Sequence, residues 1–272
     1  MEYVELQGEK VPRIGLGTWQ LTGRQCRDAV KNALDIGYRH VDTAQVYGNE
    51  RQVGQGIQAS KVDRDDVWLT TKVWRDKFRR EDVISSAEES LRKLGTDYVN
   101  LLLIHWPSEN VPFRETLDAM NQLVEEGKVR NIGVSNFTPE QLEKARKISD
   151  APLLTNQVEY HPFLDQEELL EVCRNEDMML TAYSPLARGD VLENEVLNAI
   201  GARHDKSPAQ VALRWLMQQE NVAAIPKASG HEHQADNLNV FDFQLSDEEM
   251  EQISGLEEEG RKVDPAFAPW NR

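Results

Sequence analysis

The sequence predicts that residues 1–272 form one α/β domain in which eight parallel strands close into a (β/α)₈ barrel. Eight apolar, β-rich runs alternate with amphipathic helical patterns along the whole chain. Several runs, such as residues 99–106, are continuous rather than alternating in their apolar residues, which is typical of parallel strands buried on both faces. No segment between the runs is richer in Gly, Pro or Ser than its surroundings, so the sequence marks no domain boundary.

A short β-hairpin over residues 3–13, turning at Gly8, is expected ahead of the barrel strands. The apolar end of a barrel needs cover from water, so we expect this hairpin to plug the barrel floor. In chain order, the barrel strands are expected at residues 14–17, 40–43, 67–73, 98–106, 130–135, 153–159, 179–184 and 222–226.

The helices between the strands carry recognisable end signals. Some are followed by glycine, which suits the left-handed position after a last turn. Others begin with a hydroxyl N-cap followed by proline, or with an acidic first turn that complements the helix dipole. The helices marked in these ways are expected at residues 24–36, 80–94, 138–148, 207–218 and 246–255.

An open, doubly wound sheet is the alternative architecture. Such sheets bind dinucleotides through a glycine-rich fingerprint after the first strand. The nearest candidate, Gly15-Leu16-Gly17, continues with Thr18-Trp19-Gln20 and lacks the third glycine. The closed barrel is therefore favoured.

The composition excludes several classes of partner. Lys plus Arg number 31 and Asp plus Glu number 47, which gives a formal net charge of -16. A surface this acidic repels phosphate backbones, so we expect no nucleic acid partner. The two cysteines, Cys26 and Cys173, are too few for a disulfide framework or a zinc site, so we expect no metal.

The expected location and oligomeric state rest on signals that the sequence lacks. The polar N-terminal segment has no apolar core of a signal peptide, and no stretch is long enough to span a bilayer. We therefore expect a cytoplasmic protein that binds no membrane, and a monomer, since nothing indicates an interface. The acidity suits either a cytoplasm of high salt content or an ordinary acidic enzyme.

Ionisable side chains stand at the carboxyl ends of three expected strands: Asp42, Lys72 and His105. In a barrel these ends meet at one face, where active sites lie. Buried charges are costly unless paired, so these residues need an explanation. A structural ion pair between Asp42 and Lys72 is one explanation. Catalysis is the other, because Tyr47 follows Asp42 on the loop above the same strand end.

These four side chains can promote reduction of a carbonyl group. A neighbouring Lys72 can lower the pKa of the Tyr47 phenol from about 10, while Asp42 keeps the lysine charged. A phenol tuned in this way is a general acid near neutral pH. His105, neutral among apolar neighbours, can donate a hydrogen bond to the carbonyl oxygen. None of these groups is a reductant, so a nicotinamide cofactor is required.

Five sequence blocks, in order and over nearly the whole chain, closely resemble the aldo-keto reductase family. The short loops and the Ala-Pro-Trp near the C-terminus are most similar to its bacterial 2,5-diketo-gluconate reductase and methylglyoxal reductase branch. The blocks are residues 37–50, 101–107, 133–137, 155–162 and 225–229.

The resemblance implies a role for each matching residue. Tyr47 matches the proton donor and His105 the group that orients the carbonyl. Asp42 and Lys72 match the residues that tune the pKa of the tyrosine. The positions expected to bind the cofactor are Thr18; Ser135, Asn136 and Gln157 at the nicotinamide carboxamide; Tyr183 against its ring; Ser184, Leu186 and Arg188 in the loop across the pyrophosphate; and Lys227, Ser229, His233 and Asn237 at the adenosine end.

The adenosine end departs from the family pattern. An arginine that binds the adenosine 2′-phosphate is common at the position of His233, and a serine is common at Ala228. Arginine offers phosphate a bidentate fork, whereas a neutral imidazole offers one donor. We therefore expect NADPH to remain favoured through Lys227 and Ser229, with weaker discrimination against NADH.

Tryptophans are expected to line the substrate pocket. Trp19, Trp74 and Trp106 fall at strand ends, and Trp270 lies in a tail, residues 266–272, that is expected to close the pocket from above. No cation is evidently reserved for a substrate carboxylate. Small aldehydes, dicarbonyls and keto-sugar acids therefore all remain open as substrates.

Two other functions remain open. The barrel can be a lyase in which Lys72 forms a Schiff base, although Asp42 would hold that lysine protonated. It can also be a non-catalytic nucleotide-binding module, although all four catalytic positions are intact. His161 and His204 lack a site-like context and are expected to be structural or surface residues.

Overall fold

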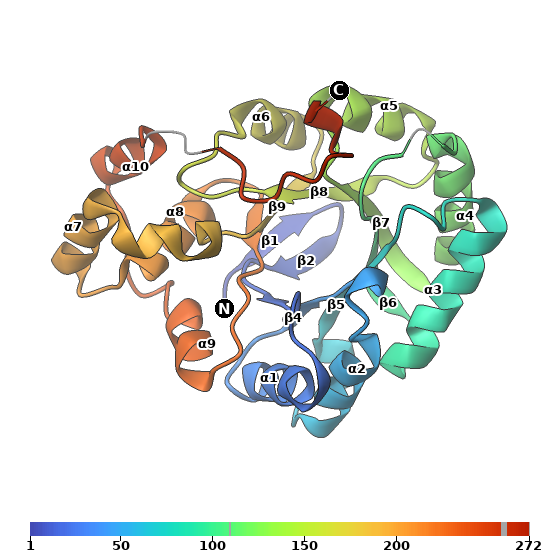
Figure 1. The fold of residues 1–272 in the computed structure, drawn as a ribbon, viewed down its shortest axis with the longest axis horizontal. Helices are drawn as coiled ribbons and strands as arrows, with labels where there is room; N and C mark the ends of the chain where they lie inside the picture. Colours follow the sequence, from blue (N-terminus) through green and yellow to red (C-terminus); the bar gives the residue numbers. More distant parts are fainter. Residues whose placement is uncertain (109, 257–259, 272) are drawn as a thin grey trace.

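The computed structural model describes residues 1–108, 110–256 and 260–271, and it confirms the predicted barrel (Figure 1). Strands adjacent in sequence pair in parallel around the sheet, from β3 to β10. The sheet closes where Ile14, just before β3, bridges Ala224 in parallel. The strands are β3 (Leu16–Gly17), β4 (His40–Asp42), β5 (Trp68–Val73), β6 (Val99–Ile104), β7 (Val129–Ser135), β8 (Leu153–Glu159), β9 (Met179–Tyr183) and β10 (Val222–Ala224).

The seam of the barrel extends beyond these strand limits. The amide of Gly15 donates to the carbonyl of Ala224 at 2.9 Å, and that of Gly17 donates to Pro226 at 3.1 Å. A side chain at Gly17 would meet the backbone oxygen of Ile225 at 2.5 Å. Glycine at this position therefore lets the first and last strands approach closely.

The helices surround the barrel, and their ends follow the predicted signals. Thr138, Ser207 and Ser246 each form a capping box with the residue three positions later. The helices are α1 (Gly23–Asp35), α2 (Glu50–Ala59), α3 (Arg80–Leu94), α4 (Phe113–Glu125), α5 (Pro139–Ile148), α6 (Glu167–Asn175), α7 (Glu195–His204), α8 (Pro208–Gln218), α9 (His231–Leu238) and α10 (Asp247–Ser254).

The N-terminal hairpin plugs one end of the barrel, as predicted. Strands β1 (Tyr3–Leu6) and β2 (Glu9–Pro12) pair in antiparallel fashion and appear within the ring of strands in Figure 1. Their inward side chains Val4, Leu6 and Val11 form a separate apolar cluster with side chains from the barrel interior. The barrel contributes Trp68, Leu101, Leu103, Leu154, Met179 and Ala223.

The C-terminal tail, residues 260–271, crosses the opposite end of the barrel (Figure 1). One end is therefore closed by the hairpin, whereas the end that carries the strand carboxyl termini is covered only by loops and this tail. Among the described residues, no helix combines the length and the apolar character needed to cross a membrane.

Candidate active site

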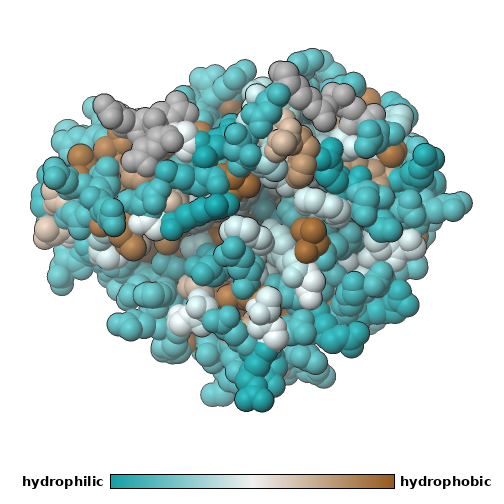
Figure 2. All heavy atoms as spheres, viewed as in Figure 1, coloured by the Kyte–Doolittle hydropathy of each residue, from teal (hydrophilic) through white to brown (hydrophobic). Residues whose placement is uncertain are grey.

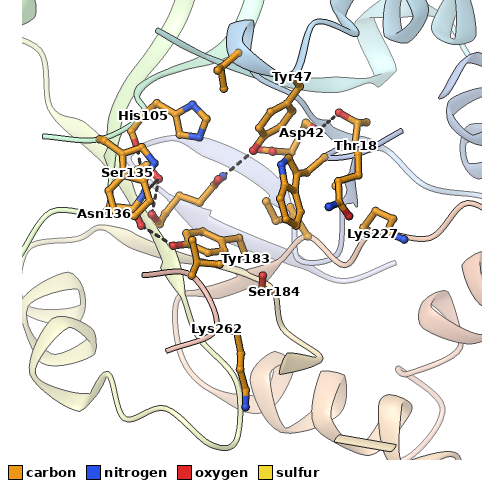
Figure 3. Close-up of a pocket in the computed structure, with 18 of the residues that line it drawn as sticks. Thr18, Asp42, Tyr47, His105, Ser135, Asn136, Tyr183, Ser184, Lys227 and Lys262 are labelled. Carbon is orange, nitrogen blue, oxygen red and sulfur yellow. Dashed lines mark hydrogen bonds between the residues drawn. The ribbon is translucent and has the colours of Figure 1, made fainter. Parts of the chain in front are cut away.

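The strand carboxyl ends surround a cavity of about 660 Å³. Figure 2 shows the hollow at the centre of this face, and Figure 3 shows the side chains that project into it. The volume is in the range of ligand pockets, roughly 300–1,000 Å³. The predicted site residues that line it are Thr18, Trp19, Asp42, Tyr47, Trp74, His105, Trp106, Ser135, Asn136, Gln157, Tyr183, Ser184, Arg188 and Lys227.

Asp42 and Lys72 form a buried ion pair beneath this cavity. Lys72 Nζ lies 2.5 Å from Asp42 Oδ1 and also donates to the carbonyl of Thr43 at 2.8 Å. The other carboxylate oxygen accepts a hydrogen bond of 2.8 Å from Gln157 Nε2. Burial lowers the pKa of Lys72, and the charge of Asp42 opposes that shift. The lysine is fully buried and does not line the cavity, which disfavours its use as a Schiff-base nucleophile.

Tyr47 ends a 3-10 turn, Gln45–Tyr47, that follows β4 and places the phenol at the cavity. Lys72 Nζ lies 5.2 Å from the centre of its ring. Burial raises the pKa of Tyr47 well above its usual value, and the charge of Asp42 raises it further. The prediction of an acidic phenol was therefore wrong in this structure. The lysine charge is compensated by Asp42, and the loss of hydration then dominates.

His105 follows β6 and lies between two aromatic rings. Its ring centre is 5.6 Å from that of Tyr47 and 5.1 Å from that of Trp74, in edge-to-face arrangements. Burial, with a smaller effect of Lys72, lowers its pKa well below the usual value, which confirms the predicted neutral imidazole. Nδ1 is buried without a hydrogen-bond partner among the described residues, which leaves Nε2 as the nitrogen available to the cavity.

The residues expected at the nicotinamide carboxamide form one hydrogen-bonded group. Ser135 Oγ donates to the carbonyl of Gln157 at 2.7 Å. Asn136, whose φ of 63° is left-handed, donates to the carbonyl of His105 at 3.0 Å. The Tyr183 hydroxyl donates to Asn136 Oδ1 at 2.7 Å. These bonds fix the side chains at the cavity wall (Figure 3).

The residues expected further along the cofactor are divided between this cavity and the adjoining surface. Arg188 lines the cavity and its guanidinium lies 5.3 Å from the centre of the Trp19 ring. His233 is exposed in the first turn of α9. Four of the predicted residues, Leu186, Ser229, His233 and Asn237, are not among those that line the cavity.

Aromatic side chains at the strand ends, Trp19, Trp74 and Trp106, form another part of the wall, and aromatic side chains of the tail pack against Trp74 and Trp106. Phe267 lies edge-on to Trp74 and Trp106, at centre distances of 6.2 and 5.4 Å. Trp270 packs on Trp106 at 5.6 Å but lines a neighbouring cavity rather than this one. Trp19 is 41% exposed at the rim. The predicted aromatic pocket is thus present, with Trp270 in its outer layer.

Several lining residues were not predicted from the sequence: Gln20, Val46, Lys262, Val263, Asp264 and Pro265. They lie in loops and in the tail, where no periodic pattern shows which side chains point inward. The sequence pointed to them only through the tail that was predicted to close the pocket. That predicted tail begins at Ala266, four residues after the first lining residue of the tail, Lys262. Phe267 was inside the predicted tail but was not singled out.

Comparisons with known proteins agree with this geometry. A model of the Aldo/keto reductase family matches residues 13–258. The chain is 44% identical to a 9,11-endoperoxide prostaglandin H2 reductase of Trypanosoma cruzi over 93% of this chain and 90% of the relative. It is 41% identical to a glyoxal reductase of Bacillus subtilis, covering 93% and 92%. A crystal structure assigned to 2,5-diketo-D-gluconic acid reductase B superposes with a TM-score of 0.96 at 47% identity, covering 98% and 96%.

Proposed function

Since the chain belongs to the aldo/keto reductase family, we propose that it reduces small aldehydes and dicarbonyls to alcohols with NADPH as the favoured cofactor and Tyr47 as the proton donor. Carbonyl reduction follows from the family and its reductase relatives. The proposed cofactor preference, substrate class and residue roles rest on the geometry of the cavity.

The cavity fits a nicotinamide dinucleotide, the cofactor class that the family uses. Tyr183 offers an aromatic surface, and Ser135, Asn136 and Gln157 place amide and hydroxyl groups beside it. Arg188 and Lys227 add positive charge where a pyrophosphate and an adenosine phosphate would bind. When bound, the cofactor supplies the two electrons and the hydrogen that the carbonyl carbon gains.

Tyr47 and His105 are suited to the carbonyl oxygen. Their rings meet edge to face at 5.6 Å, and both side chains line the same cavity. A neutral imidazole donates a hydrogen bond to the oxygen without competing to give up its proton. A phenol with a raised pKa retains its proton at neutral pH and transfers it when negative charge develops on the oxygen.

The Asp42–Lys72 pair is proposed to support this transfer. Its positive end lies 5.2 Å from the centre of the phenol ring and favours negative charge on Tyr47 after the proton has left. Asp42 is in turn fixed by Gln157 at 2.8 Å, so the pair keeps a single geometry. Preorganised charge of this kind needs no rearrangement during the reaction.

Discrimination between NADPH and NADH is proposed to be weak. His233 is exposed, and the acidic Glu232 precedes it in the first turn of α9. A carboxylate here repels a 2′-phosphate, and one imidazole cannot replace the fork of an arginine. Lys227 and Ser229 are both exposed and are proposed to supply the remaining preference for NADPH.

The wall of the cavity favours carbonyl compounds with an apolar or flat part. Trp74, Trp106 and Phe267 form one edge-to-face aromatic group next to His105. The relative named a glyoxal reductase supports small dicarbonyl compounds, and the neighbour assigned to diketo-gluconate reduction keeps keto-sugar acids as a second class.

The observation that carries this proposal is the placement of Tyr47 and His105 together at the cavity, above the Asp42–Lys72 pair. The test is consumption of NADPH by the purified protein with a panel of methylglyoxal, benzaldehyde and a keto-sugar acid. We expect turnover with the first two. Borohydride trapping of a substrate on Lys72, without NADPH consumption, would instead establish a lyase.

A further inference from the structure

Glu159 is a fully buried carboxylate at the end of β8 that the reaction described above does not use. Its neighbour on the next loop, His161, is also fully buried, and His161 Nε2 lies 3.2 Å from Glu159 Oε1. The amide of Phe163 donates to His161 Nδ1, so Nε2 is the protonated nitrogen that donates to the carboxylate. The predicted structural role of His161 therefore has a defined partner.

The remaining bonds of the Glu159 carboxylate reach the C-terminal tail, more than a hundred residues away. Oε1 accepts the amide of Lys262 at 2.7 Å, and Oε2 accepts the amide of Val263 at 3.0 Å. Burial alone would raise the pKa of Glu159, but the bonds from His161 and the two amides hold it below its usual value. Both oxygens of one buried, ionised carboxylate thus hold two consecutive peptide groups.

The segment held in this way forms a wall of the cavity. Residues 262–265 line it, and Phe267, two residues further on, contacts Trp74 and Trp106. Trp74 in turn packs against His105. Inside the tail, Asp264 accepts hydrogen bonds from Trp270 and Asn271, so the two ends of the tail are tied to each other.

We propose that Glu159, held by His161, is a positioning residue that sets substrate selectivity by fixing the C-terminal tail. The tail then forms one wall of the substrate pocket with residues 262–265 and packs Phe267 against the lining residues Trp74 and Trp106. The proposal rests on the proposed function and extends it. Glu159 does not touch Tyr47 or the Asp42–Lys72 pair in any hydrogen bond of the described residues. Loss of the hydrogen bonds from Glu159 to the tail therefore affects substrates that contact the tail wall more than substrates that contact only Tyr47 and His105.

The central test is Glu159→Gln, which keeps the shape but places an amide donor opposite a tail amide. We expect KM for benzaldehyde to rise about tenfold, which corresponds to the loss of one charge-assisted hydrogen bond. KM for methylglyoxal should change less than about twofold, because this smaller substrate depends less on the wall. The kcat for methylglyoxal and the Kd of NADPH, measured by fluorescence quenching, should stay within about twofold.

A second readout does not depend on activity. Trypsin cleaves after Arg261 and Lys262, and the amide nitrogens of those two bonds are the ones that Glu159 holds. Native digestion followed by mass spectrometry should show cleavage at these bonds about tenfold faster in Glu159→Gln, because local opening is easier. An unchanged rate of cleavage at these bonds would refute the proposal that Glu159 holds the tail.

The chain offers a matched control. His204 Nε2 lies 2.9 Å from Glu249 Oε2 on α10, a second histidine–glutamate pair, in which His204 is partly exposed and which does not line the cavity. Glu249→Gln should change neither the selectivity nor the cleavage after Lys262. Equal changes in both variants would mean that the effect of Glu159 is general loss of stability, and the proposal would fail.

Two further variants complete the test. In a Phe267→Ala background, Glu159→Gln should add little to KM for benzaldehyde, because both changes weaken the packing of the tail against Trp74 and Trp106. If Glu159→Gln does not fold, Val263→Pro removes one held amide from the tail side, with Val263→Ala as its control. Cleavage is then compared only after Arg261, because trypsin does not cleave a lysine–proline bond. Faster cleavage with unchanged selectivity would overturn the role of Glu159 in substrate selectivity.

A wild-type protein that consumes no NADPH would overturn the proposed function. The digestion experiment would still decide whether Glu159 holds the tail.

Discussion

Lys72 Nζ lies 5.2 Å from the centre of the Tyr47 ring, yet its charge is bound to Asp42 at 2.5 Å. The ammonium is close enough to favour a phenolate, but the carboxylate cancels much of its field at the hydroxyl. Burial then keeps the proton on Tyr47. The arrangement resists ionisation of the phenol in the free enzyme and still stabilises negative charge that develops during the reaction.

Tyr47→Phe should abolish proton donation without disturbing the fold. The phenylalanine fills the same space, and the Asp42–Lys72 pair keeps its partners Thr43 and Gln157. We expect kcat for methylglyoxal to fall about 10²–10⁴-fold, the usual contribution of a general acid. The Kd of NADPH should stay within about twofold. Full turnover by this variant would remove Tyr47 from the proposed mechanism.

The pH dependence of reduction follows from the same geometry. Tyr47 must be protonated, so kcat is lost only as the pH rises through its pKa, which burial raises well above 10. His105 has a lowered pKa and stays neutral above its ordinary value of 6.5. We therefore expect a flat kcat profile from about pH 7 to about pH 9. A decline centred near neutral pH would show that the lysine acidifies the phenol after all.

The buried ion pair should be costly to break from one side. Lys72→Met leaves the carboxyl group of Asp42 without its cation in a buried position. We expect the free energy of unfolding to fall by about 3–5 kcal/mol, as for other buried pairs that lose one partner. The double variant Asp42→Asn, Lys72→Met should be less destabilised than the sum of the single changes, measured by urea denaturation. Additive losses would mean that the two residues act independently.

Much of this site could be predicted because parallel strands bring distant residues to one face. Asp42 ends β4, Lys72 is the last residue but one of β5, and His105 follows β6 directly. The alternation of apolar runs with helical patterns was enough to group these three residues. The protonation of Tyr47 could not be predicted in this way. The protonation state depends on the distances from the phenol to the opposite charges of Asp42 and Lys72, and on how far water is excluded. The spacing of residues along the sequence shows neither.

The tail shows the other limit of the sequence. Glu159 and Val263 are separated by 104 positions, and their contact follows from the path of an irregular segment. Irregular segments have no repeat that reveals which backbone groups face the barrel. The aromatic character of the tail was visible in Trp270, whereas residues 262–265 line the cavity and Phe267 packs against the lining residue Trp106.

Cofactor choice provides a prediction at the exposed first turn of α9. His233→Arg introduces a bidentate phosphate donor beside Lys227 and Ser229. We expect the ratio of kcat/KM for NADPH over NADH to rise about tenfold or more, equivalent to one added charge-assisted hydrogen bond. His231→Arg, also exposed and two residues earlier, adds the same charge without matching the proposed contact position. If both variants raise the ratio equally, net charge rather than a specific phosphate contact controls it. If the wild type already prefers NADPH by about 10⁴ or more, His233 does not weaken discrimination, and the adenosine end must bind the phosphate through other groups.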